Sequence, residues 1–106
     1  MSDATIGYID SGPVRPIRYE LLYFWSPTCH PCREVSLHVS YLERQLAGRV
    51  DVERIEVTTQ PDVANRYQVM SVPTVLLLRD GRVVRSAVGA RTLQQLRELV
   101  EEGMGE

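Results

Sequence analysis

Residues 24–35 read FWSPTCHPCREV and contain both cysteines of the chain, with His30 and Pro31 between them. A pair this close can be a redox-active dithiol, half of a metal site, or an inert pair. Thiols are kept reduced in the cytosol, where such a pair is more often catalytic or metal-binding than a structural crosslink. The rest of the sequence must decide among these three interpretations.

The length and composition of the chain predict one globular domain, residues 1–106, with ends at 1–3 and 103–106 that fray. Apolar residues make up 43% and charged residues 25% of the chain, as in ordinary globular proteins. Acidic and basic residues are mixed along the chain and give a net charge of −2. We therefore expect no nucleic-acid or membrane surface. The N-terminus lacks a signal-peptide pattern, and we therefore expect a cytoplasmic protein, most simply a monomer.

The pattern of apolar residues predicts strands and helices in alternation. The expected elements are a strand at 4–10, a buried strand at 19–25, a helix at 31–47, a strand at 50–57, a short helix at 61–68, a hairpin at 74–79 and 82–89, and a helix after Thr92. The succession of strand, helix and strand predicts a parallel pair of strands with a right-handed crossover, and the hairpin adds antiparallel strands at one side.

Local signals support these assignments. One face of the helix at 31–47 would carry Val35, Val39, Leu42 and Leu46. The pair Asp80-Gly81 suits the type I′ turn of a hairpin. Thr92 and Gln95 have the spacing of a capping box, which marks a helix start.

Six short motifs resemble those of thioredoxin, in the same order and at similar spacing. They are the strand ending in Phe24-Trp25, the CHPC dithiol, Pro61, Val72-Pro73-Thr74, Asp80-Gly81 and Val88-Gly89-Ala90. The resemblance covers nearly the whole chain. It implies an α/β fold with a mixed five-stranded sheet flanked by helices, a shortened or lost N-terminal helix, and Pro73 in cis beside the dithiol.

The dithiol predicts thiol-disulfide exchange. Cys29 would lie just before a helix, where unpaired backbone amides and the positive end of the helix dipole favour a thiolate. We therefore expect Cys29 to be the nucleophile, with Cys32 the resolving thiol one turn further on. The expected activity is ping-pong exchange with protein disulfides without a bound cofactor, and the resemblance implies a thioredoxin-reductase-type electron donor.

Three residues around the dithiol are expected to modulate it. A charged His30 would make Cys29 more acidic and the couple more oxidising, because it stabilises the thiolate. Pro31 stiffens the turn, which argues against a very strong oxidant. Trp25 can stack beside the site, as the resemblance implies, or be an ordinary core residue at a strand end.

Four residues are candidates for binding the substrate. Val72 and Pro73 could present backbone groups to an extended substrate segment, as the resemblance implies. Gly89 would allow close backbone approach. Thr28 stands where the family usually has a tryptophan before the first cysteine, so we expect less apolar contact area and a different substrate preference.

Tyr23 stands where the family has a buried aspartate that accepts the proton of the resolving cysteine. A phenol with a pKa near 10 cannot be a base at neutral pH. Cys32 must then lose its proton to water, to His30 or to another group. Glu20 and Glu56 are the candidates for that group, and we expect slow resolution of mixed disulfides.

The remaining predictions concern other interpretations of the same residues. A zinc site needs four ligands, and only His30 and His38 could join the cysteines, so we predict no metal site. We expect His38 to be solvated, Met70 to be a packing residue like its neighbour Tyr67, and Arg54 to lack the ion-pair partner usual in the family. The lost aspartate and tryptophan favour an alternative function, a thioredoxin-fold interaction module that binds a partner without catalysis.

Overall fold

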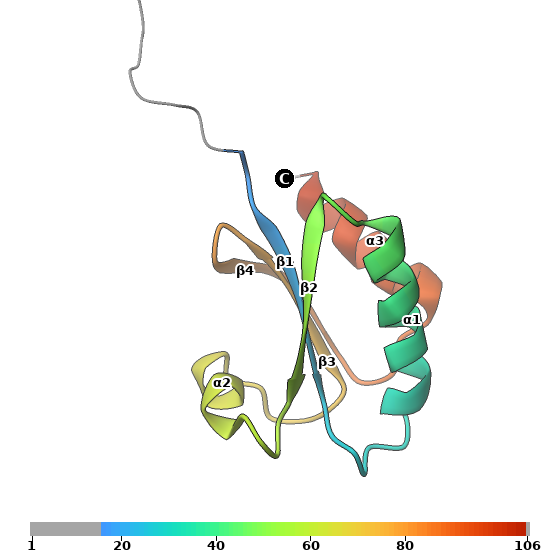
Figure 1. The fold of residues 1–106 in the computed structure, drawn as a ribbon, viewed down its shortest axis with the longest axis vertical. Helices are drawn as coiled ribbons and strands as arrows, with labels where there is room; N and C mark the ends of the chain where they lie inside the picture. Colours follow the sequence, from blue (N-terminus) through green and yellow to red (C-terminus); the bar gives the residue numbers. More distant parts are fainter. Residues whose placement is uncertain (1–15, 106) are drawn as a thin grey trace, which may run out of the picture.

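The computed structural model describes residues 16–105. A mixed sheet in the order β2-β1-β3-β4 is covered by α1 and α3 on one face and by α2 on the other (Figure 1). The elements are β1 (Tyr19–Trp25), α1 (Cys32–Gln45), β2 (Val50–Glu56), α2 (Pro61–Arg66), β3 (Thr74–Arg79), β4 (Arg82–Val88) and α3 (Leu93–Met104). The described sheet has four strands and not the predicted five, since the strand expected at 4–10 falls outside the described residues.

The central strand β1 connects the sheet to the dithiol. It pairs in parallel with β2 and antiparallel with β3, and β3 continues into the hairpin with β4. The parallel pair is joined through α1, as the alternation of strand and helix predicted. The chain leaves β1 at Trp25 and enters α1 at Cys32, so the intervening loop lies at the lower end of the sheet in Figure 1.

Side chains of β1 alternate between two cores, because successive residues of a strand point to opposite faces. Tyr19, Leu21 and Tyr23 belong to the core on the side of α1 and α3. Leu22 and Phe24 belong to the second core, on the side of α2. This alternation determines which residues lie beneath the start of α1.

Two local predictions are confirmed. Asp80 and Gly81 have φ values of 49° and 84°, and positive φ at both positions is what a type I′ turn requires. At the start of α3, the Gln95 amide donates to the Thr92 hydroxyl over 3.1 Å and the Thr92 amide donates to the Gln95 side chain over 2.9 Å. The expected capping box is therefore present.

Two expectations about the chain's surface are wrong. The helix α3 continues through Gly103 and Met104, and Gly103 is buried, so the chain does not fray from residue 103. Met70 is 93% exposed and is not a packing residue, whereas Tyr67 packs edge to face on Phe24 with 6.3 Å between ring centroids. An apolar side chain in a loop has no periodicity from which its burial could be predicted.

Candidate active site

The two cysteines lie at the junction of β1 and α1 and differ in burial. They form a disulfide in this structure, with 5.3 Å between their Cα atoms. Cys29 is in the loop and partly exposed, whereas Cys32 is the first residue of α1 and only 3% exposed. An external disulfide can therefore approach Cys29 easily, but not Cys32.

Backbone hydrogen bonds shape the loop around Cys29. Its amide donates to the Ser26 carbonyl over 3.2 Å, while the amides of Cys32 and Arg33 donate to the carbonyls of Cys29 and His30 over 3.2 and 3.1 Å. Two of the amides expected to face the Cys29 sulfur are therefore already engaged with carbonyl groups. What α1 supplies at this sulfur is mainly the positive end of its dipole.

The segment Val72-Pro73 lies at the same end of the sheet. Thr74, the first residue of β3, pairs with Phe24 near the end of β1. The Val72–Pro73 peptide bond is cis, Pro73 is buried and Val72 is half-buried. The Gly89 amide donates to the Pro73 carbonyl over 2.8 Å, which brings Gly89 to this end as well.

The other candidate residues are placed as follows. His30, Pro31 and Thr28 are exposed in the loop around Cys29. Trp25 is half-buried and packs against the core on the side of α1 and α3. Its packing agrees with the core interpretation, and its place at the strand end beside the loop leaves stacking at the site open.

Tyr23 lies beneath the start of α1 and is fully buried. Its hydroxyl donates to the Cys32 carbonyl over 2.9 Å and lies 2.8 Å from the Ser36 hydroxyl. Burial raises the pKa of the Tyr23 phenol, while the hydrogen bond with Ser36 and the charge of Arg54 act in the opposite direction. The phenol stays protonated at neutral pH and, as its residue type predicted, cannot take the proton of Cys32.

The two carboxylates proposed as alternative bases have very different places. Glu20 lies near the far end of β1, on the face opposite Tyr23 by strand alternation. Glu56 pairs in register with Trp25 at the dithiol end, on the same face as Tyr23 by the same alternation, and accepts a hydrogen bond from Thr58 over 2.5 Å. The position of Glu20 excludes it as the base for Cys32. Glu56 remains a candidate for that base.

Contacts of α1 extend one expectation and correct another. The partner usual in the family is replaced by Tyr23, and the Arg54 guanidinium donates instead to Glu43 and to the Ser40 hydroxyl over 2.9 Å each. The side chain of His38 is only 20% exposed and its Nε2 lies 3.6 Å from the Glu34 carboxylate. Both contacts depend on how α1 lies on the sheet, which the helix sequence alone does not determine.

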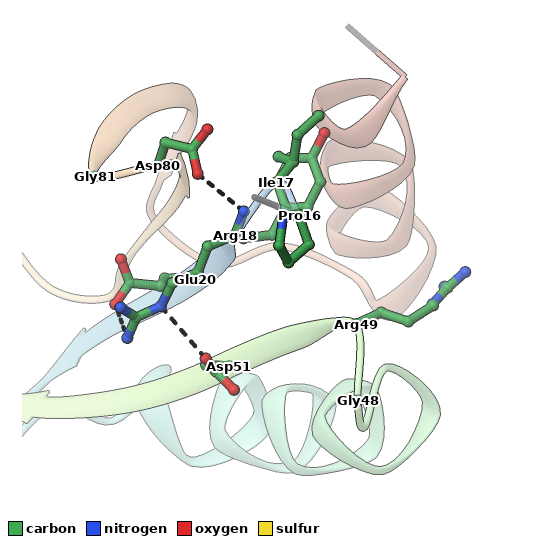
Figure 2. Close-up of a pocket in the computed structure, with 10 residues that line it drawn as sticks. Pro16, Ile17, Arg18, Glu20, Gly48, Arg49, Asp51, Asp80 and Gly81 are labelled. Carbon is green, nitrogen blue, oxygen red and sulfur yellow. Dashed lines mark hydrogen bonds and ion pairs between the residues drawn. The ribbon is translucent and has the colours of Figure 1, made fainter. Parts of the chain in front are cut away.

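A polar hollow of about 850 Å³ lies at the far end of the sheet, and sequence reasoning missed it (Figure 2). The Arg18 guanidinium lies 3.6 Å from Glu20 and 3.7 Å from Asp51, and the Arg18 amide donates to Asp80 over 3.0 Å. Arg49 points away from these groups (Figure 2). The hollow is formed by segments far apart in sequence, so no motif announces it.

Metal-binding clusters and membrane-spanning helices are both lacking in the described part of the chain. Within residues 16–105, no three histidine, cysteine or acidic side chains are grouped so that they could hold a metal ion. No helix in that same part of the chain has the length and apolarity to cross a membrane.

Comparisons with known proteins agree on one family. The sequence model of the thioredoxin family matches residues 15–102. Thioredoxin from Bacillus subtilis is 35% identical over 79 residues, which are 74% of this chain and 76% of that protein. Thioredoxin from Staphylococcus aureus is 30% identical over 83 residues, 78% of this chain and 80% of that protein. A mutant thioredoxin from Halobacterium salinarum has a similar structure, with a TM-score of 0.73 and 31% identity over 79% of this chain and 73% of that one.

Proposed function

The chain belongs to the thioredoxin family and is a protein-disulfide oxidoreductase, and we propose that Cys29 is its attacking thiol and Cys32 its resolving thiol. The observation that carries this assignment is the unequal burial of the two residues at the β1–α1 junction. The attacking thiol must reach an external disulfide, whereas the resolving thiol has only to reach its neighbour.

The reaction proceeds by two exchanges. The Cys29 thiolate attacks one sulfur of a substrate disulfide, a mixed disulfide forms, and the other substrate sulfur leaves as a thiolate that takes up a proton. Cys32 then loses its proton and attacks the Cys29 sulfur, which releases the second substrate thiolate. Two electrons pass from the dithiol to the substrate, and the Cys29–Cys32 disulfide described above is the oxidised product. The reverse sequence oxidises a substrate dithiol.

The neighbouring backbone supplies a surface for the substrate. Val72 would present its backbone groups to an extended segment on one side of Cys29. Pro73 has no amide hydrogen and its carbonyl accepts from Gly89, so Pro73 and Gly89 would support this segment from behind. Thr28, exposed next to Cys29, offers little apolar area, so affinity would rest mainly on backbone contacts. His30 tunes the reactivity of Cys29, Pro31 stiffens the turn, and Trp25 stacks beside the site.

Trapping tests this assignment. A Cys32→Ser chain should accumulate a mixed disulfide through Cys29 when mixed with a protein that carries a single disulfide, because the second exchange is blocked. The Cys29→Ser chain is the matched control and should accumulate none. If the Cys32→Ser chain also traps nothing, the alternative holds, namely an interaction module that binds a partner without exchange.

Membership of the family implies protein substrates and a reductase as partners. We propose that this electron donor is of the thioredoxin-reductase type, and that the protein acts in the cytoplasm as a monomer with no bound cofactor, nucleic acid or membrane contact. Catalysed turnover with a purified thioredoxin reductase would test the donor. A molar mass of one chain by light scattering would test the monomer, and a dimer would contradict it.

A further inference from the structure

We infer that Tyr23 and Ser36 form a positioning pair that holds Cys32 ready to resolve the mixed disulfide, an inference that rests on the proposed exchange. Tyr23 comes from the central strand and Ser36 from the second turn of α1, and their hydroxyls meet under the first turn of that helix. Neither residue touches the substrate. Their effect would pass through the backbone of Cys32.

The direction of these hydrogen bonds follows from counting protons. A carbonyl can only accept, so the one proton of the Tyr23 hydroxyl goes to the Cys32 carbonyl, 2.9 Å away. The Ser36 hydroxyl, 2.8 Å from the same phenol oxygen, is then the donor of the second bond. The chain of donors runs from Ser36 to Tyr23 to the carbonyl of Cys32.

The start of α1 has no side-chain cap, and it is tied to the sheet through the carbonyl of Cys32. The residue before α1 is Pro31, which makes no side-chain hydrogen bond to the start of the helix. The Tyr23 hydroxyl joins the first helical residue to the sheet, and Tyr23 itself is 0% exposed in the core on the side of α1 and α3. A side chain held in this way has little freedom, so the position of Cys32 is defined by the strand beneath it.

Holding the backbone of Cys32 affects the chemistry of its sulfur. When the disulfide opens, the Cys32 thiol stays close to Cys29, and closure of the ring loses little conformational freedom. This favours both attack on the mixed disulfide and the oxidised state at equilibrium. Loss of the hydrogen bond should therefore slow resolution and make the dithiol a weaker reductant.

The chain contains its own control. Tyr19 lies on the same strand and the same face as Tyr23, and its hydroxyl also donates to a helix carbonyl, that of Met104 at 3.1 Å. This bond is at the far end of the sheet. Tyr19→Phe and Tyr23→Phe both delete a bond from a tyrosine hydroxyl to a helix carbonyl, and only the second deletion touches the dithiol. Tyr23→Phe also removes the bond to Ser36, which Ser36→Ala removes by itself.

The experiment compares Tyr23→Phe, Ser36→Ala, Tyr19→Phe and the parent chain. The disulfide equilibrium with glutathione and the single-turnover rate of resolution are measured for each. We expect Tyr23→Phe to lower the equilibrium constant for the Cys29–Cys32 disulfide, and the resolution rate, by about two- to tenfold, the range expected for one hydrogen bond. Ser36→Ala should shift both in the same direction by less, and Tyr19→Phe should leave both unchanged.

A merely structural role for Tyr23 would lower stability but leave these two quantities as they are. Equal values for Tyr23→Phe and Tyr19→Phe would therefore overturn the inference. If Tyr23→Phe does not fold, an unchanged equilibrium in Ser36→Ala would do the same. Failure of the underlying function looks different, because the Cys32→Ser chain would then trap no mixed disulfide at all.

Discussion

The two ends of β1 use the same bond for different purposes. At each end a tyrosine hydroxyl from the strand donates to a helix carbonyl: Tyr23 to Cys32 of α1, and Tyr19 to Met104 of α3. At the far end the bond fastens the last helix to the sheet. At the dithiol end it fastens a residue that must react, so packing and chemistry depend on the same atoms there.

The surroundings of the two ends differ in charge. The far end has the polar hollow, where Arg18 faces Glu20 and Asp51 (Figure 2). Arg18 and Asp51 are largely exposed, whereas Glu20 is half-buried. Since Arg18, which both pairs share, is open to water, each pair contributes about 1 kcal/mol or less to stability. The dithiol end has no comparable hollow among the described pockets, yet it holds both sulfurs. The reactive site is therefore identified by its chemistry and not by the size of a cavity.

The largest predicted effect is on activity, which should depend on the dithiol end of β1 and not on the far end. Cys29→Ser should reduce disulfide exchange to the uncatalysed rate, because Cys32 is too buried to attack an external disulfide efficiently. Arg18→Ala at the far end should leave exchange unchanged. Reduction of a protein disulfide, followed as turnover, measures both. Substantial activity in Cys29→Ser would mean that the roles of the two cysteines are reversed.

The second predicted effect is on stability, and it should arise away from the dithiol. A Cβ on Gly103 would overlap the side chain of Leu77, which is fully buried. Gly103→Ala should therefore lower the free energy of unfolding by about 1–3 kcal/mol through overpacking, with little change in exchange by the folded protein. Urea unfolding measures the first quantity and turnover the second.

Gly105→Ala is the matched control for this substitution. Gly105 is exposed with a φ of −81°, and an added Cβ would make only ordinary contacts there. Its free energy of unfolding should stay close to that of the parent chain. Equal losses for the two variants would show that Gly103 is not restricted by Leu77.

Sequence reasoning succeeded where short-range chemistry decides the structure. The order of the elements from β1 onward, the Asp80-Gly81 turn and the Thr92 capping box each follow from residues within a few positions of one another. The dithiol was found for the same reason, since two cysteines three positions apart at a helix start can be recognised from the local sequence alone. The family resemblance extended these local signals to the whole fold.

Long-range packing was not predictable in the same way. The partners of Arg54 come from α1, eleven and fourteen positions away, and the burial of Gly103 depends on Leu77 in β3. Ser36 carried no signal as a functional residue, because a serine in a helix has no distinguishing pattern. Only the crossing of α1 over β1 brings it to Tyr23.

The third effect is electrostatic and confined to the dithiol end. We expect His30→Gly to slow the alkylation of Cys29 near neutral pH slightly, because the imidazolium that it removes favours the thiolate. The effect should be small, since a charge next to an exposed group is strongly screened by water. The couple should become slightly more reducing. The rate of alkylation against pH gives the first quantity and a glutathione series the second. His38→Gln is the control, since His38 pairs with Glu34 on α1 and not with the dithiol loop, and an equal shift in both variants would count against a specific role for His30.

The smallest effect sharpens the comparison of the two tyrosines at high pH. Burial raises the pKa of Tyr23 in the folded chain, whereas an unfolded tyrosine loses its proton near a pKa of about 10. The unfolded state then binds fewer protons than the folded state, so the contribution of Tyr23 to stability is complete below about pH 10 and is lost as the pH rises further. Urea unfolding between pH 8 and 11 should show the stability advantage of the parent chain over Tyr23→Phe shrinking with pH. An advantage that stays constant over this range would mean that the Tyr23 phenol ionises as easily in the core as in water.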